Sequence, residues 1–360
     1  MKNVIANRRN RNAVSQGKRA TMRDVAKHAG VSSITVSRVL REPDKVSPML
    51  RQRILSAVEE LGYFANQVAS GLASGASRIV PVLIPTLSTA FFMTFLNGVR
   101  AELEPRGYEV LLGTTEYREE VETRLIATFL GWFPAGLIVA GIDHAPVTRQ
   151  RLTSAVATGV PVVEYLEMTD TPIDINVGFS HRAVGEAAAR FFAANGYRHI
   201  AYAGTLGSLD KRASRRVAGF QKVLHSMCLP CHYVLLSEEP FSFFVGARVF
   251  AQLIDTYPMI EAIFFANDDM AAGALGEAQK RGIRVPQELA ILGFSDYEIA
   301  SVMTPSISSI NVNPVEMGRI AARILLHSLD GSPSIDRRID TGFQIIERET
   351  TLRLNHVVDS

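Results

Sequence analysis

The chain has 360 residues, 47% of them hydrophobic and 21% charged, which is typical of a soluble globular protein of two or three domains. It contains only two cysteines and no run of 18 apolar residues, so we expect neither a disulfide framework nor a membrane-spanning segment. The first 20 residues are basic and no apolar segment follows them, which disfavours a secretory signal and predicts a cytoplasmic protein.

The net charge of +2 is distributed unevenly along the chain. Residues 1–80 carry 14 lysines and arginines against five acids, a net charge of +9, which leaves −7 for the remainder. A basic N-terminal region on an acidic remainder is the pattern of a region that binds the phosphates of a nucleic acid. A solvated basic terminus would explain residues 1–20, but not the sixty that follow.

Periodicity predicts three short helices near the N-terminus. They cover residues 22–29, from Ser32 or Ser33 to about Leu40, and residues 48–61. Thr21 is placed to cap the first helix, and Gly30 stands where a left-handed residue ends it. Two short helices joined by a glycine-containing turn form a helix-turn-helix unit. We therefore expect an all-α DNA-binding domain over residues 21–65, preceded by a disordered basic arm over residues 1–20.

The residues of this region resemble the opening of lactose-repressor-type (LacI family) regulators. The resemblance rests on the run from Thr21 to Ser32, the run from Thr35 to Leu40, Val46-Ser47, and Leu61-Gly62-Tyr63 before Asn66. In such modules the second helix enters the major groove of DNA. The resemblance implies DNA contacts from Thr21, Ser32, Ser33, Ile34, Thr35, Ser37, Arg38 and Asn66. Arg38 has the reach for a guanine or a phosphate, whereas Ile34 is limited to an apolar contact such as a thymine methyl group.

Residues 66–77 resemble the hinge helix and linker of the same family. Leu72 matches the position of a leucine that wedges into the minor groove. Ser70 and Gly71 depart from the residues common there, and Gly71 costs up to about 1 kcal/mol of helix propensity. We therefore expect this hinge helix to form only on DNA.

From Arg78 onward, short apolar runs alternate with amphipathic stretches. The predicted strands are Ile79–Ile84, Glu109–Gly113, Gly136–Ala140, Val160–Glu164, Ile173–Val177, His199–Gly204, Tyr233–Leu236, Ala262–Ala266, Leu289–Gly293 and Ser308–Val312. The predicted helices are Phe91–Arg106, Glu119–Trp132, His181–Asn195, Arg215–Met227, Phe243–Tyr257, Asp268–Arg281 and Pro314–Asp330. This alternation predicts an α/β body of two doubly wound parallel-sheet half-domains, with a ligand at the carboxyl ends of the strands.

The body also resembles the LacI family, for example in the run from Arg216 to Phe220 and the run from Asn267 to Ala271. The resemblance implies a periplasmic-binding-protein-like domain for effector binding and dimerisation over residues 78–355. It also implies three crossings between the half-domains. They are expected near Gly178, Pro305 and Asp330, giving half-domains of about 78–177 plus 306–329 and 178–305 plus 330–355.

The resemblance further implies the residues that hold an effector. Arg216 matches an arginine that grips effector oxygens, Phe241 an aromatic stacking position, and Asn267 a hydrogen-bonding asparagine. Thr86 and Phe91 belong to another matching stretch. Ser295 stands where the family often has an aspartate that binds sugar hydroxyls, which disfavours a neutral-sugar clamp.

Several stretches are more similar still to the gluconate-operon repressors of the family. They are Trp132, residues 161–164, 174–175 and 177–179, and Val302-Met303 before Pro305. A sugar acid would pair its carboxylate with Arg216, and its hydroxyls with Glu164, Asn267 and Asp296. We therefore expect a homodimeric repressor of sugar-acid (gluconate or ketogluconate) catabolism genes, released from operator DNA by its effector.

Two other interpretations compete with this one. The run from Cys228 to His232 fits a haem-attachment or metal-binding pattern, but it falls in an expected loop, and we expect no metal and no cofactor. No P-loop, nucleophile elbow or zinc-protease motif is present, so we do not expect an enzyme. A periplasmic-type sugar-binding protein without a DNA role would share the body fold, and the basic helix-turn-helix argues against it.

Overall fold

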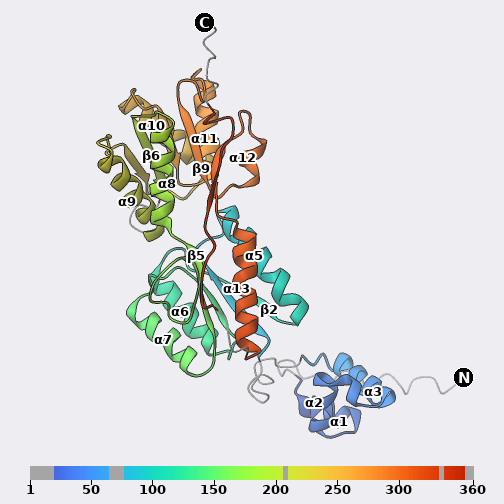
Figure 1. The fold of residues 1–360 in the computed structure, drawn as a ribbon. Helices are drawn as coiled ribbons and strands as arrows, with labels where there is room; N and C mark the ends of the chain where they lie inside the picture. Colours follow the sequence, from blue (N-terminus) through green and yellow to red (C-terminus); the bar gives the residue numbers. More distant parts are fainter. Residues whose placement is uncertain (1–19, 65–76, 206–209, 332–335, 353–360) are drawn as a thin grey trace, which may run out of the picture. The chain divides into compact units, whose positions relative to one another are not determined.

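The computed structural model describes residues 20–64, 77–205, 210–331 and 336–352. The chain divides after Ser77 into two compact units, a helical head and a body that contains two sheets (Figure 1). Each unit has a hydrophobic core of its own. The predicted arm and hinge lie almost entirely outside the described residues. Among the helices that are described, none is long and apolar enough to cross a membrane.

The head contains the three predicted helices. They are α1 (Met22–Ala29), α2 (Ser33–Arg41) and α3 (Pro48–Glu60), with the 3-10 helix η1 (Pro43–Lys45) before α3. Thr21 and Asp24 form a capping box, in which the Asp24 carboxylate accepts the Thr21 backbone N–H at 2.8 Å. Gly30 ends α1 in the left-handed conformation, with φ 62°. The sequence signals that predict these helix ends therefore act as expected.

One residue of each helix forms the centre of the head core. Val25 of α1, Val36 of α2 and Ile54 of α3 are completely buried. His28 of α1 lies 2.8 Å from the Glu60 carboxylate of α3, a contact at the surface that joins the same two helices. The core fixes α2 against its neighbours and leaves the opposite face of α2 in solvent.

The first half-domain of the body is a six-stranded parallel sheet in the order β11-β5-β4-β3-β1-β2. Its strands are β1 (Ile79–Ile84), β2 (Glu109–Thr114), β3 (Leu137–Ala140), β4 (Val162–Glu167), β5 (Ile175–Phe179) and β11 (Arg338–Asp340). Its helices are α5 (Ala90–Leu103), η2 (Glu104–Arg106), α6 (Glu119–Leu130), α7 (Pro146–Ala157) and α13 (Pro314–Leu329). The sequence pattern does not predict α7, because its buried face includes Thr148, whose hydroxyl bonds Thr123 at 2.6 Å.

The second half-domain repeats this arrangement with the strand order β12-β10-β9-β8-β6-β7. Its strands are β6 (Ile200–Thr205), β7 (Val234–Ser237), β8 (Ala262–Phe265), β9 (Ala290–Phe294), β10 (Ser308–Asn311) and β12 (Gln344–Ile346). Its helices are α8 (His181–Ala194), α9 (Lys211–Ser226), α10 (Phe243–Thr256), α11 (Asp268–Lys280) and α12 (Glu298–Val302). Only β12 pairs antiparallel, so the prediction of two doubly wound parallel sheets is confirmed.

One of the three predicted crossings between the half-domains is confirmed, and the other two lie elsewhere in the structure. The first crossing lies near Gly178 as expected, between β5 and α8. The prediction for Pro305 is wrong, because β10 pairs with β9 and the chain leaves the second half-domain only before Pro314. The prediction for Asp330 is wrong too, because β11 pairs with β5 and the chain returns only after Asp340. Strand pairing decides both boundaries, and a residue pattern does not reveal which strands pair.

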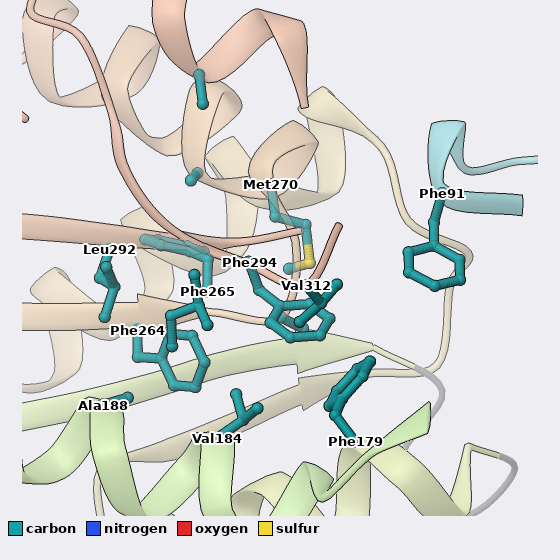
Figure 2. Packing of buried hydrophobic residues seen from close by; sticks show 14 of the residues in the cluster. Phe91, Phe179, Val184, Ala188, Phe264, Phe265, Met270, Leu292, Phe294 and Val312 are labelled. Atoms are coloured by element: carbon teal, nitrogen blue, oxygen red, sulfur yellow. The ribbon is translucent and has the colours of Figure 1, made fainter. Parts of the chain in front are cut away.

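Each half-domain is therefore built from two stretches of chain. Of the described residues, the first half-domain comprises 78–179, 314–331 and 336–340, and the second comprises 181–205, 210–311 and 344–352. Figure 1 shows α13 beside α5, although more than 200 residues separate them. The core of the second sheet is filled by such side chains as Phe264 of β8 and Leu292 of β9, with Val184 and Ala188 of α8 (Figure 2).

Candidate functional site

The exposed face of α2 is the candidate DNA-binding surface of the head. Ile34 is 74% exposed, and Arg38, one helical turn further on, is exposed as well. Ser33 and Ser37 are half-buried at the margin of this face, and Val36 lies in the core. An arginine and an isoleucine one turn apart on a solvent-facing helix suit a polar and an apolar contact to neighbouring base edges.

Three other predicted DNA contacts have structural tasks in the head. Thr21 belongs to the capping box of α1. The hydroxyl of Ser32 caps α2 by accepting the Thr35 backbone N–H at 3.2 Å, and the two hydroxyls lie 2.9 Å apart. Their side chains therefore stabilise the ends of the helices that DNA would meet. The other two predicted contacts, Asn66 and Leu72, lie outside the described residues.

A pocket of about 410 Å³ lies between the two half-domains of the body. It is lined from the carboxyl ends of strands in both sheets, where doubly wound folds bind ligands. Four predicted effector contacts line it, namely Phe91, Arg216, Phe241 and Asn267. Phe91 at the start of α5 and Phe294 at the end of β9 supply part of its apolar wall (Figure 2).

The pocket also has polar lining that the sequence interpretation does not name. These residues include Thr89, Tyr117, His181, Asp210 and Arg212. The sequence does contain a signal for Arg212, because it precedes Arg216 by four residues and therefore shares its helical face. His181 gives no such signal, because its role depends on the crossing between the half-domains.

Arg216 and His181 form the most buried polar pair of the pocket. Arg216 is 3% exposed and donates from Nη1 to Nδ1 of His181 at 2.7 Å. Burial, and next the Arg216 guanidinium, hold the pKa of His181 well below its ordinary value. The imidazole is therefore neutral and carries its proton on Nε2. The guanidinium also lies 4.5 Å from the centre of the Phe294 ring.

This pair presents unused hydrogen-bond donors. Nε of Arg216 and Nε2 of His181 are buried and find no hydrogen-bond partner among the described residues. The same holds for Nδ2 of Asn267, whose Oδ1 caps α11 by accepting the Met270 backbone N–H at 3.0 Å. Buried donors of this kind are satisfied by a ligand or by water.

A close helix contact fixes the backbone under Arg216. A Cβ atom at Gly185 of α8 would lie 1.9 Å from the Arg216 carbonyl oxygen, and one at Gly219 of α9 would lie 2.1 Å from the Arg182 carbonyl oxygen. Only glycine lets the two helices approach so closely. The contact holds α9, and with it Arg216, against the start of α8 at His181.

Arg212 connects the pocket to a second compartment of about 520 Å³. It lines both spaces together with Tyr117, whose ring centre is 5.7 Å from the guanidinium. Nε of Arg212 lies 3.3 Å from the Asp210 carboxylate, so this arginine has a counter-charge from the protein. Arg212 belongs to the second half-domain and Tyr117 to the first, so the contact spans the pocket.

Two hydrogen-bonded ion pairs of the described residues bridge the half-domains beside these compartments. Arg215 of α9 forms two hydrogen bonds of 2.6 Å with Asp143, which follows β3. Lys211 of α9 donates to Glu119 of α6 at 2.8 Å. Although burial acts to raise the pKa of Asp143, the hydrogen bonds from Arg215 lower it below its ordinary value. Both pairs join groups that any opening of the half-domains would separate.

Glu164 does not line the pocket, so the prediction that it contacts the effector is wrong. It is completely buried, accepts the Ile173 backbone N–H at 2.7 Å and lies 3.5 Å from Nε2 of His144. Successive side chains of a strand point to opposite faces, and Glu164 shares the face of Val162, which packs in the core under α6 and α7. The pocket takes Leu166 instead, at the end of the same strand, where a positive φ of 87° interrupts the alternation.

Asp296 and Thr86 are corrected in the same way, since neither lines the pocket. The Asp296 carboxylate accepts the side-chain amide of Asn311 at 2.8 Å and pairs with Arg348 at 2.7 Å. The Thr86 hydroxyl accepts the Ser88 backbone N–H at 3.1 Å and so shapes the turn after β1. Their neighbours in sequence, Ser295 and Thr89, reach the pocket in their place.

Comparisons with known proteins agree with the helix-turn-helix head and with the two-sheet body. A family model described as "Bacterial regulatory proteins, lacI family" matches residues 21–66, and one for a periplasmic binding protein-like domain matches residues 189–351. The chain is 38% identical to the HTH-type transcriptional regulator GntR of Pseudomonas aeruginosa, over 92% of this chain and 96% of the relative. It is 29% identical to the regulator IdnR of Escherichia coli, over 92% of this chain and 98% of that relative.

Solved structures give the same result over most of the chain. A LacI family regulator from Silicibacter pomeroyi matches with a TM-score of 0.86 and 33% identity, covering 93% of this chain and all of that one. The lac repressor dimer bound to operator matches with a TM-score of 0.74 and 26% identity, with the same coverage. These relatives are transcriptional regulators, not enzymes. The chain belongs to the LacI family of DNA-binding transcriptional regulators.

Proposed function

We propose that this regulator is a cytoplasmic homodimer that represses genes of sugar-acid catabolism and is released from its operator by a bound sugar acid such as gluconate or a ketogluconate. The observation that carries the proposal is the unpaired buried charge of Arg216. Its hydrogen-bond partner His181 is neutral, and no acid of the pocket pairs with it among the described residues.

A buried guanidinium is stable only with a compensating anion, so the pocket calls for a ligand with a carboxylate. The free donors of Arg216, His181 and Asn267 suit the oxygens of such a ligand. The Phe241 ring suits the apolar face of its carbon chain. The similarity of the sequence to gluconate-operon repressors points to the same class of ligand.

On DNA, we propose that α2 reads the major groove through Ser33, Ile34, Ser37 and Arg38. A single head offers too few contacts for useful specificity, so two heads of a homodimer would bind a pseudo-palindromic site. The lac repressor, a relative of this chain, is described as a dimer on its operator. Asn66 would add a backbone contact, and Leu72 of each protomer would wedge into the minor groove between the half-sites.

The bridging ion pairs suggest how the ligand acts on DNA binding. A sugar acid that contacts Arg216 in one half-domain and Phe91 in the other binds better when the two are close together. Arg215 with Asp143 adds to the same closed arrangement. Closure would then change the positions of the two hinge segments, so that both Leu72 side chains no longer fit one minor groove. A ligand shifts such an equilibrium only through its different affinities for the two states.

Calorimetry on the full chain tests the ligand class. Gluconate or 2-ketogluconate is expected to bind with micromolar affinity. Glucose lacks the carboxylate and would leave the Arg216 guanidinium unpaired, so it is expected to bind roughly a hundredfold more weakly or not at all. Tight binding of glucose would contradict the carboxylate requirement. A raised melting temperature with the acids alone would support it independently.

A further inference from the structure

We propose that Asp210 makes the pocket selective for a singly charged sugar acid and excludes doubly charged ones. This inference rests on the proposed function, and it concerns which acids the same pocket accepts. It follows from the way in which the charges of the pocket are paired.

Three side chains that line the pocket carry a full charge, namely Asp210, Arg212 and Arg216. His181 is neutral, as described above. The segment 206–209, which precedes Asp210, contains no ionisable residue. The described lining therefore has a net charge of +1, which a single carboxylate neutralises.

Asp210 neutralises one of the two arginines and not the other. Its carboxylate lies 3.3 Å from Nε of Arg212 and accepts the Arg212 backbone N–H at 3.1 Å. The side chain caps α9 and is 5% exposed, so its charge is held in place by the start of the helix. Arg216, one turn further along α9, hydrogen-bonds the neutral His181 and has no carboxylate as an ion-pair partner in the described part of the chain.

The charged groups behind the lining supply no unpaired positive charge for a second carboxylate. Arg215 is paired with Asp143, and Glu167 lies 3.7 Å from Arg215. Burial raises the pKa of Asp268 to about 8 and that of Glu167 to about 7, so at physiological pH Asp268 is mostly protonated and Glu167 is partly ionised, which adds negative rather than positive charge. The described lining holds no further cation for a second carboxylate of the ligand.

A dicarboxylate would therefore place its second charge near a fixed carboxylate, with no free guanidinium to receive it. D-glucarate provides this comparison, because it differs from D-gluconate only in carrying a carboxylate in place of the terminal hydroxymethyl group. Like charges brought together in a buried site repel strongly, so we expect the wild-type chain to bind gluconate roughly tenfold or more tightly than glucarate.

The test is calorimetry of both acids with the full-length wild type and with Asp210→Asn. Asparagine is an equally good helix N-cap, so α9 keeps its cap while the negative charge is removed and Arg212 becomes available. The preference for gluconate is expected to fall by roughly tenfold or more, mainly through tighter binding of glucarate. If Asp210→Asn does not fold, Asp210→Ser offers another uncharged cap.

Asp296→Asn is the matched control. Asp296 is also a largely buried acid, 11% exposed and paired with an arginine, but it does not line the pocket, and asparagine tolerates its positive φ of 55°. This variant should keep the wild-type preference. Equal binding of the two acids by the wild type, or an unchanged preference in Asp210→Asn, would overturn the role of Asp210 while leaving the proposed function intact. Failure of both acids to bind the wild type would overturn the proposed function itself.

Discussion

Replacing Arg216 with methionine is expected to weaken gluconate binding by about 3–5 kcal/mol, which is roughly 150- to 5000-fold. Among the described residues that line the pocket, this guanidinium is the cation without a protein counter-charge, so its loss leaves a buried carboxylate of the ligand unpaired. Methionine keeps most of the side-chain volume against Phe294, and the helix contact at Gly185 involves only the backbone of this position. Calorimetry with gluconate measures the loss.

Arg190→Met is the matched control for this substitution. Arg190 lies on α8, is paired with Glu186 and faces solvent away from the pocket, so its replacement should leave gluconate affinity unchanged. Operator affinity without ligand should stay at the wild-type level in both variants. Undiminished gluconate binding by Arg216→Met would refute the carboxylate clamp, although the chain would remain a LacI family regulator.

The second large effect is expected on DNA. Arg38→Ala should lower operator affinity by about 1–3 kcal/mol, the range of a bidentate contact to a base. Arg38 is exposed on α2, outside the core formed by Val25, Val36 and Ile54, so the head should remain folded. Fluorescence anisotropy with a labelled operator and with a scrambled duplex at fixed salt separates base contacts from phosphate contacts.

The control for Arg38 is Lys45→Ala, which removes an exposed cation of η1 that is paired with Glu42. It should affect operator and scrambled duplex alike, and only slightly. An equal loss of affinity for both duplexes in Arg38→Ala would show that Arg38 contacts a phosphate rather than a base. Gluconate binding should be unchanged, and its loss would indicate misfolding.

The elements of this fold are largely predictable from the sequence, because local signals determine them. Thr21, Gly30 and the apolar stripes place the helices of the head, and apolar runs place ten strands of the body. The three-residue edge strands β11 and β12 carry no such run, so the pattern does not predict them. These strands and the pairing of β10 decide where the chain crosses between the half-domains. A local sequence pattern therefore does not predict the boundaries of the half-domains.

The pocket is predictable in part for a similar reason. Arg216, Phe241 and Asn267 were identified by their resemblance to family positions, and all three line the pocket. Glu164 is in the correct strand, but its side chain lies on the face of Val162, and the strand reaches the pocket only at its end, with Leu166. Asp296 and Thr86 are each within three residues of a true lining residue, yet turn geometry directs their side chains to other partners.

The central claim is that one bound sugar acid controls DNA binding, and operator affinity with and without gluconate tests it most directly. An operator selected from random duplexes by the full-length protein would be titrated by anisotropy, with glucose and Arg216→Met as controls. Saturating gluconate is expected to weaken operator binding about 5- to 150-fold, the range of typical couplings, and glucose should have no effect. Unchanged or tighter operator binding at saturating gluconate would contradict the account.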